Sequence, residues 1–313
     1  MVFPEGRDER IIRAARILKD ENIAMPIVLG KPEDIKAATK AADVGLDGIE
    51  TINPKKSNKV NLYAEKYIER RRDVSSAVAK RLVAKPLLYA GMMVASGDAK
   101  AVVGGLVSAT STIIQAAALT IGLTPGSKTA SSYFLMIVPK FPGEENKRFI
   151  FADCAVNINP DAEQLADIAL AAARNAEQLL DEQVRVAMLS FSTKGSAFGA
   201  DVDKVKKAMK IARSRKPELA IDGEFQVDTA IVPQVAAKKL KVESVVAGRA
   251  NVLIFPDLDA ANIAYKLTQY MAGAAAIGPF LQGFASPVTD LSRGASVDDI
   301  IAATIITLVQ CSD

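Results

Sequence analysis

Short apolar runs, each followed by a polar or glycine-containing loop and then a helical pattern, recur along this chain and limit the folds open to it. Ile23–Gly30 has the composition of a buried strand, and Lys31–Thr39 that of a short helix with proline in its first turn. Further strands are predicted at Ala101–Val103, Phe149–Val156, Val184–Phe191 and Asn251–Phe255, and helices at Thr112–Gly122, from Asn159 to about Leu180, and at Ala260–Ala272. Strands separated by such helices indicate an α/β fold with mostly parallel sheets covered on both faces.

One stretch is long and apolar enough to resemble a membrane span. Residues 101–127 contain no charged side chain but many hydroxyl and amide groups, each costing roughly 1–3 kcal/mol if left unsatisfied in lipid. We therefore expect a buried strand, loop and helix, and no membrane partner. Charges in Met1–Arg10 argue against a signal peptide, and only Cys154 and Cys311 are present, so we expect a cytoplasmic protein.

The charge balance and the absence of histidine exclude several kinds of function. The 313 residues carry 39 basic and 36 acidic side chains, and a net charge of +3 gives no case for nucleic acid as a partner. Without histidine the chain lacks the commonest general base, the Ser-His and Cys-His nucleophile pairs and the usual zinc ligand sets. The usual zinc sites are therefore excluded, and we expect no metal site.

Two loops have the composition of a phosphate site. Gly104–Thr112 offers glycines for close backbone approach and hydroxyls at a helix start, although a helix cap within a packing interface explains the same letters. Ser192–Ser196 offers Lys194 beside Gly195, although an ordinary loop with a solvated lysine is as good an explanation. Neither loop matches a Walker or dinucleotide fingerprint, and each signal is weak by itself.

A third candidate is the segment around Ser292 and Arg293. Gly294 follows them, so a hydroxyl and a guanidinium can project from one turn, and an arginine fork matches phosphate geometry. Asp299 stands three residues after Ser296, which is the spacing of a capping box before the apolar run Ile300–Val309. Spacing alone favours that capping role for Asp299, and a carboxylate with two oxygens can serve a second role as well.

The segment around Ser292 and Arg293 resembles the corresponding part of the phosphate acetyltransferase (phosphotransacetylase) family, and the likeness extends over the rest of the chain. The matching stretches are Val2–Arg10 (VFPEGRDER), Phe151–Asn157 (FADCAVN), Val186–Ala197 (VAMLSFSTKGSA), Ala220–Asp228 (AIDGEFQVD), Ala247–Leu258 (AGRANVLIFPDL), Asn262–Lys266 (NIAYK) and Gly278–Ser296 (GPFLQGFASPVTDLSRGAS). Several long motifs in the right order are far more specific than a single glycine pattern.

The resemblance implies a two-domain α/β/α protein like isocitrate and isopropylmalate dehydrogenases. Residues 1–127 with 289–313 would form the first domain and 128–288 the second, with the active site in the cleft between them. It also implies a homodimer that transfers an acetyl or other short acyl group reversibly between acyl phosphate and coenzyme A, which is a substrate and not a cofactor.

Residue roles follow position by position from the resemblance. Ser292 and Arg293 match the family's catalytic pair, and Asp299 matches its proposed base for the thiol of coenzyme A. The predicted substrate-binding residues are Arg70, Thr112, Tyr265 and Lys266. Because a carboxylate is a much weaker base than a thiolate, we expect the proton to leave as the thiol attacks.

The chain departs from the family pattern in ways that leave its specificity open. Ile114 stands where the family usually has an arginine, and Ile277 where it usually has a tyrosine. These changes are compatible with a longer acyl group or with altered affinity for coenzyme A. A protein that binds acyl-CoA without turnover is the main alternative, and a metal-dependent dehydrogenase is less favoured because no aspartate cluster is evident.

Overall fold

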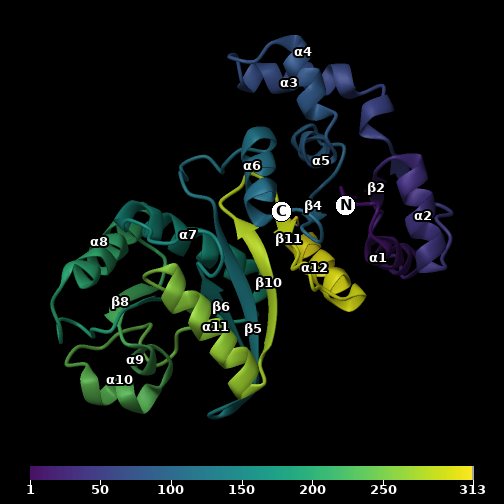
Figure 1. The fold of residues 1–313 in the computed structure, drawn as a ribbon. Coiled ribbons are helices and arrows are strands. Elements are labelled where there is room, and N and C mark those ends of the chain that lie inside the picture. The colour runs from purple at the N-terminus through teal and green to yellow at the C-terminus, as the bar shows by residue number, and fades with distance from the viewer. Residues whose placement is uncertain (312–313) are drawn as a thin grey trace. The chain divides into compact units, whose positions relative to one another are not determined.

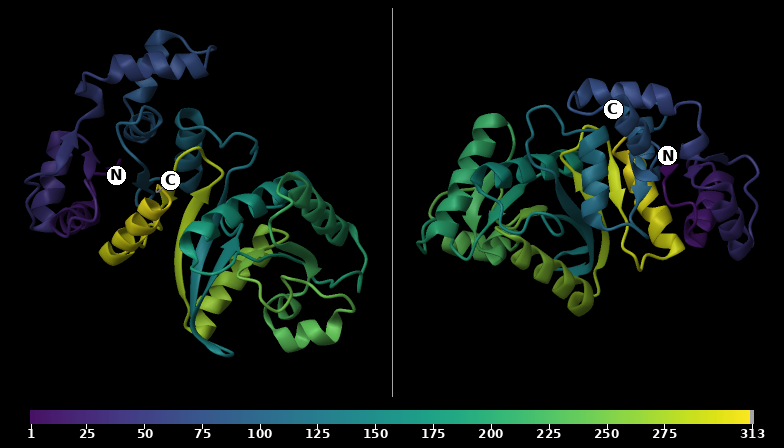
Figure 2. Two further views of the ribbon diagram at one scale, coloured as in Figure 1. Left: turned by 180° about the vertical axis from the view of Figure 1, so that it is seen from behind. Right: turned by 45° about the horizontal axis from the view of Figure 1, so that its top comes forward.

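The computed structural model describes residues 1–311, which fold as two compact units (Figure 1). The first unit contains Met1–Pro125 and the segment from Phe284 onward, so two distant stretches of chain build it. In both views of Figure 2 the yellow helix of the late segment lies beside the purple helix of the early one, and the two are in contact. The second unit is the continuous stretch Gly126–Gly283. Sequence analysis places the two boundaries after residues 127 and 288.

The first unit is built on a fully parallel sheet. Its strands lie in the order β3-β2-β1-β4-β11, so the last strand of the chain pairs beside β4. They are β1 (Val2–Phe3), β2 (Ile27–Leu29), β3 (Glu50–Ile52), β4 (Val102–Gly104) and β11 (Val288–Asp290). Because the strands are parallel, all their carboxyl ends meet at one edge of the sheet.

Helices and one short 3-10 turn connect these strands. They are α1 (Glu9–Asp20), α2 (Pro32–Ala42), η1 (Pro54–Lys56), α3 (Val60–Arg70), α4 (Ser76–Val83), α5 (Pro86–Ala95), α6 (Thr110–Thr120) and α12 (Val297–Val309). Proline at the first position starts α2, and Asp43 in the left-handed conformation ends it. α1 buries one apolar face, which includes Ile12 and Ala15, against β2 and α2.

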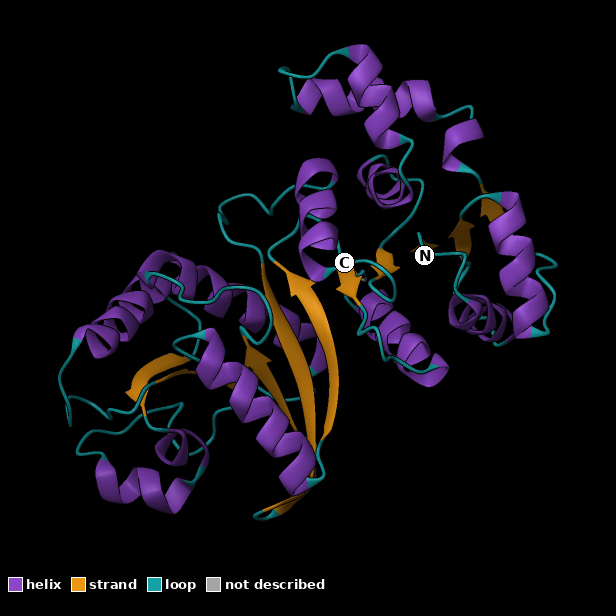
Figure 3. Cartoon of the chain, in the orientation of Figure 1, coloured by secondary structure: helices purple, strands orange, loops and turns teal. Residues whose placement is uncertain are grey.

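The second unit combines an antiparallel half-sheet with a parallel one in the order β10-β5-β6-β9-β7-β8. Its strands are β5 (Ser131–Phe141), β6 (Glu144–Ala152), β7 (Val186–Leu189), β8 (Ile221–Phe225), β9 (Val252–Ile254) and β10 (Ala275–Gln282). Its helices are α7 (Ala162–Leu179), α8 (Ala200–Arg215), α9 (Val227–Ile231), α10 (Pro233–Lys239) and α11 (Leu258–Ala272). Figure 3 shows β5 and β10 as the two long neighbouring orange strands.

The predicted fold class, a mostly parallel α/β protein, is confirmed, with one addition. The β5–β6 hairpin, turning at Gly143, and the antiparallel strand β10 were not predicted. Residues 101–127 divide into β4, a loop and α6, as expected for a buried strand, loop and helix. Within residues 1–311, no helix combines the length and apolar character needed to cross a bilayer.

Candidate active site

A cavity of about 400 Å³ lies at the carboxyl edge of the first unit's sheet. Loops that follow four of its parallel strands line it, which is where ligands bind in sheets of this kind. Its apolar walls include Leu29, Pro54, Ala84, Pro86, Leu87, Leu88, Ala116 and Leu119. Four cations line it as well, namely Arg7, Lys31, Lys55 and Lys85, and none of them forms an ion pair within the described chain. The cavity therefore offers an apolar floor with unpaired positive charge around it.

The glycine loop after β4 is held by a carboxylate from within the protein. Glu5, 6% exposed, accepts hydrogen bonds from four successive backbone N–H groups, at 2.9 Å from Gly105, 2.8 Å from Leu106, 3.2 Å from Val107 and 2.8 Å from Ser108. This is the arrangement by which loops bind phosphate, with a glutamate side chain in the place of the anion. Of the two features that suggested a phosphate site in this loop, close backbone approach is therefore already used by Glu5. The Thr110 hydroxyl is bound to Asp290, and the hydroxyl groups of Ser108, Ser111 and Thr112 have no partner among the described residues.

Ser292 and Arg293 lie on an exposed turn directly after β11, as predicted. The guanidinium of Arg10 fixes the backbone of this turn, with Nη1 donating to the carbonyl oxygens of Arg293 and Ala295 at 2.9 Å each. Asp8 holds Arg10 in turn, through hydrogen bonds of 3.0 Å from Nε and 2.8 Å from Nη2. Those bonds hold the pKa of the Asp8 carboxyl below its usual range. Among residues 1–311 the guanidinium of Arg293 has no partner, so a fixed turn presents a free cation.

Asp299 forms the predicted capping box at the start of α12. Its Oδ2 accepts hydrogen bonds from the backbone N–H of Ser296 at 2.9 Å and from the Ser296 hydroxyl at 2.8 Å. The Ser296 hydroxyl oxygen accepts the backbone N–H of Asp299 at 3.1 Å. Asp299 is exposed and all these bonds involve Oδ2, so Oδ1 stays available for the second role.

Asp290, the last residue of β11, was not predicted as a site residue. Its side chain is 2% exposed, its Oδ2 accepts a hydrogen bond from the hydroxyl of Thr110, and its Oδ1 has no partner in the described structure. Burial raises the pKa of Asp290 to about 6, and the charge of Glu5 adds to the rise, while Thr110 and Arg293 oppose it. Asp290 and Glu5 escaped the sequence analysis because their partners lie 180 and 100 residues away.

The remaining predicted residues of the first unit have different surroundings. Thr112 is exposed in the first turn of α6 and lines the cavity. Arg70 ends α3 and donates to the carbonyl oxygens of Thr120 and Ile121 at the end of α6, and it does not line the cavity. α6 also contributes Gln115 to the cavity wall, and Ile114 does not line it.

Tyr265 and Lys266 lie on α11 in the second unit. The ring of Tyr265 stacks on Phe134 with centroids 4.3 Å apart, and burial raises its pKa. The ammonium of Lys266 lies 5.7 Å from the centre of the Tyr265 ring, and the side chain is exposed. The Tyr-Lys pair is therefore formed, with the lysine charge available to an anion.

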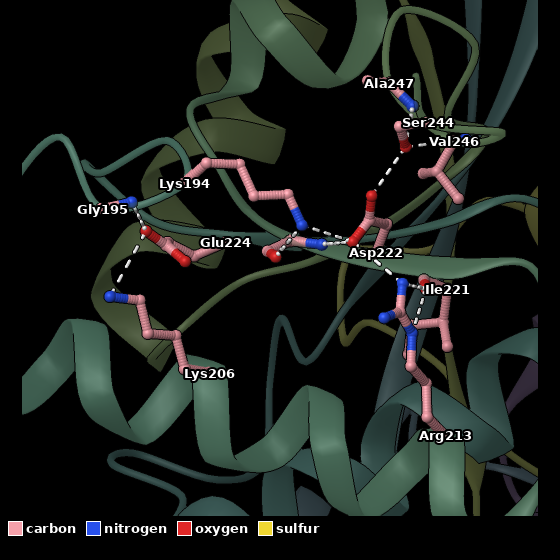
Figure 4. Close-up of polar contacts among 11 residues, drawn as sticks. Lys194, Gly195, Lys206, Arg213, Ile221, Asp222, Glu224, Ser244, Val246 and Ala247 are labelled. Atoms are coloured by element: carbon pink, nitrogen blue, oxygen red, sulfur yellow. Dashed lines mark hydrogen bonds and ion pairs between the residues drawn. The ribbon is translucent and has the colours of Figure 1, made fainter. Parts of the chain in front are cut away.

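In the second predicted phosphate loop, Ser192–Ser196, the polar groups are already bound by other residues of the second unit (Figure 4). Glu224, 1% exposed, accepts the Ser192 hydroxyl at 2.9 Å and the Gly195 N–H at 2.6 Å. The ammonium of Lys194 donates to Asp222 at 2.6 Å and to the carbonyl oxygen of Gly223 at 2.8 Å. Lys194 is thus not free for a phosphate, and Asp222 and Glu224, both on β8, belong to a paired network.

A parallel α/β sheet with a cationic cavity at its carboxyl edge and a free arginine on a fixed turn is suited to a protein that binds an anionic ligand. This chain belongs to the phosphate acetyl/butaryl transferase family, whose pattern matches residues 1–308. It is 45% identical over 312 residues to the phosphate acetyltransferase of Acetivibrio thermocellus, covering 99% of this chain and 93% of that protein. The resemblance found in the sequence is confirmed.

Solved structures agree with this assignment. A phosphotransacetylase from Streptococcus pyogenes is 40% identical and superposes with a TM-score of 0.92, covering 99% of this chain and 93% of that one. The 4-hydroxythreonine-4-phosphate dehydrogenase from Klebsiella pneumoniae, at 11% identity and a TM-score of 0.58 over 99% of this chain and 98% of that one, shares the fold. The predicted similarity to a dehydrogenase fold is thereby confirmed.

Proposed function

We propose that this protein transfers a short acyl group reversibly between acyl phosphate and coenzyme A and releases phosphate. The observation that carries the proposal is the turn of Ser292 and Arg293, whose backbone Arg10 fixes and whose guanidinium is unpaired in the described chain. A fixed, unpaired arginine beside a hydroxyl suits a reaction in which negative charge develops on a carbonyl oxygen and a phosphate leaves. Family membership supports the same reaction.

The chemistry needs few groups from the protein. The sulfur of coenzyme A attacks the acyl carbonyl carbon and forms a C–S bond, while the carbonyl electrons move to oxygen. Collapse of this oxyanion breaks the bond to the phosphate oxygen, and phosphate leaves with the electron pair. Arg293 neutralises the leaving phosphate, Ser292 donates a hydrogen bond to developing negative charge, and Oδ1 of Asp299 accepts the thiol proton as the C–S bond forms.

The cavity at the carboxyl edge suits coenzyme A. This substrate joins an adenine ring, whose flat faces pack on apolar side chains, and a flexible chain to several phosphate groups. Apolar walls around Leu29 and Leu88 match the first part, and the unpaired Lys31, Lys55 and Lys85 match the second. Thr112, in the first turn of α6, stays a predicted contact to substrate phosphate.

Roles for Arg70, Tyr265 and Lys266 in substrate binding also stay predictions. Arg70 carries five N–H donors, of which the carbonyl oxygens at the end of α6 engage Nη1, so the other groups are available to a ligand. Lys266 is exposed beside the half-buried ring of Tyr265, which suits a contact to phosphate.

A homodimer is part of the proposal, and an exposed apolar stripe on α11 supports it. Ile263, Leu267, Tyr270 and Met271 are 57%, 52%, 81% and 81% exposed and recur at helical spacing, which is the pattern of a helix face that pairs with another protein surface. Leu267→Glu with Tyr270→Glu should then give monomers in sedimentation analysis.

Location in the cytoplasm is also part of the proposal. It is supported by Cys154 and Cys311, which are both free thiols.

The decisive experiment is a thioester-formation assay with purified protein, coenzyme A, and acetyl, propionyl and butyryl phosphates in parallel. Turnover that Arg293→Ala lowers at least a hundredfold, while Arg13→Ala on the exposed face of α1 leaves it unchanged, would establish the transferase. The ranking of the three substrates gives the acyl preference. Retained acyl-CoA binding in calorimetry without any turnover would identify a binding protein on a transferase scaffold and refute the proposal.

A further inference from the structure

Two buried carboxylates lie against the glycine loop after β4, and they are not equally satisfied. Glu5 accepts four backbone N–H groups, which is enough to stabilise a full negative charge in a buried place. Asp290 accepts one hydroxyl, and its Oδ1 has no partner within the described residues. A buried carboxylate with a bare oxygen is poorly stabilised as an anion, so the surroundings of Asp290 favour its protonated form more than water does.

The position of Asp290 connects the catalytic turn with the start of α6. Asp290 pairs in register with Gly104, and the N–H of Leu291 donates to the carbonyl oxygen of Gly104 at 2.6 Å. Two residues later comes Ser292, and the Asp290 side chain reaches Thr110 in the first turn of α6. The charged groups that face Asp290 are Glu5, from the loop after β1, and Arg293, from its own turn.

The direction of the hydrogen bond between Asp290 and Thr110 depends on the proton of Asp290. An ionised carboxylate can only accept, so the Thr110 hydroxyl must then donate to it. A protonated carboxyl can donate to the Thr110 oxygen, which leaves the hydroxyl hydrogen free for another acceptor. Thr110 stands at the N-terminus of α6, where backbone N–H groups and the helix dipole favour an anion.

We propose that Asp290 is a positioning residue for the transfer reaction, because it frees the Thr110 hydroxyl to donate to the phosphate group held by Arg293 only while Asp290 carries a proton. This inference rests on the proposed function for the identity of the phosphate ligand. Ionisation of Asp290 also adds negative charge near Arg293, and this charge weakens phosphate binding as well. The pKa of about 6 places the change within the range where the protein can be assayed.

The test is the pH dependence of phosphate binding. Inorganic phosphate affinity by calorimetry and the KM for acetyl phosphate are measured between about pH 5 and 7 for the wild type, Asp290→Asn and Thr110→Val. If only the protonated form binds well, wild-type binding weakens about tenfold over this interval, beyond any change common to all variants from the ligand's own ionisation. kcat should change less than KM, because the group acts on the bound phosphate and not on the proton of the thiol.

The variants separate positioning from mere structural support. The amide of Asp290→Asn is always neutral and can donate to Thr110, so its affinity should match the wild type at low pH and lose the extra pH dependence. Thr110→Val should bind phosphate weakly and keep only the part of that pH dependence that comes from the Asp290 charge near Arg293, and Thr110→Ser should restore the rest. Thermal unfolding checks that each variant is folded.

Two results would overturn the proposal. One is an Asp290→Asn profile that parallels the wild type, and the other is a Thr110→Val profile that does so. If no variant, the wild type included, turns over any acyl phosphate, the proposed transferase function fails. The calorimetric profile with inorganic phosphate then still decides whether Asp290 controls anion binding.

Discussion

The two glycine loops, one in each unit, are built alike and differ in how their charges are balanced. Each rests on a buried glutamate that accepts its N–H groups, Glu5 in the first unit and Glu224 in the second. Around Glu224 and Asp222 the second unit supplies its own cations, with Lys206 3.8 Å from Glu224, and Lys194 and Arg213 2.6 and 2.9 Å from Asp222.

The first unit leaves the corresponding charges unmatched. Asp290 has one bare oxygen, and Arg293 has no partner in the described residues. Charges that are all paired within the protein stabilise its fold and have no need of a ligand. An unpaired charge held in a fixed place can form an ion pair with a ligand of opposite charge. The difference favours the turn of Ser292 and Arg293, in the first unit, as the proposed anion site, whereas each loop was only a weak candidate in the sequence.

The largest expected effect contrasts the two cations beside these loops. Arg293→Ala should lower kcat/KM about 100- to 1000-fold, because in the proposed reaction this charge neutralises the leaving phosphate. Lys194→Ala, which removes an already paired and partly exposed cation, should leave kcat/KM unchanged and cost about 1 kcal/mol of unfolding free energy. Steady-state kinetics and urea unfolding measure both. A large activity loss in Lys194→Ala would erase the contrast between the loops.

The second contrast concerns the loop glycines. A Cβ added at Gly105 would lie 2.5 Å from the backbone nitrogen of Leu291 and 2.5 Å from Oδ1 of Asp290, so Gly105→Ala should lower the unfolding free energy by about 3 kcal/mol. Gly195 also has a positive φ, but its Cβ would meet nothing within 4 Å, so Gly195→Ala should cost only about 1 kcal/mol. Equal losses in urea unfolding would show that the two loops are packed alike.

The third contrast is the pH dependence of stability at the two aspartates. The raised pKa of Asp290 means that the folded state holds a proton more tightly than the unfolded state, so its contribution is lost as pH rises from about 4 through 6. Asp290→Asn should therefore stabilise the protein by about 2 to 3 kcal/mol at about pH 8 and leave it unchanged at about pH 4.

Asp222 should behave in the opposite way. Burial would raise its pKa, but hydrogen bonds from Lys194, Ser244 and the Gly223 N–H together lower it. Its stabilisation is present above the ordinary carboxyl pKa and lost as pH falls through the lowered one. Asp222→Asn should therefore destabilise the protein at neutral pH and progressively less in acid. Thermal unfolding across pH would contradict this if both variants shifted in the same direction.

The smallest contrast compares the two capping boxes. Ser296→Ala at α12 and Asp161→Ala at α7 each remove a side-chain acceptor at a helix start and should each cost about 1 kcal/mol of unfolding free energy. Only Ser296→Ala also releases Asp299 from a hydrogen bond, so only this variant should change kcat. Equal kcat values for the two variants would show that Asp299 takes no part in the reaction.

How far the sequence could be interpreted depended on how local each signal was. The strands β2, β4 and β9 follow from apolar runs of adjacent residues, and the Ser292–Arg293 turn follows from its own motif. β1, with two residues, is too short to show a period, and the β5–β6 hairpin turns at Gly143 between long strands whose pairing is antiparallel. The roles of Glu5 and Asp290 depend on burial and on distant partners, which the order of residues does not contain.

The clamp of Arg10 on the turn after β11 has a consequence for how the protein is made. The second unit is continuous in sequence, so the ribosome completes it before Phe284 onward is synthesised. Until then β4 lacks one neighbouring strand, α1 lacks the α12 helix that packs against it, and Arg10 lacks the carbonyl oxygens that it will hold. A nascent chain therefore completes its first unit last, after a long interval with an open sheet edge that chaperones and proteases can reach.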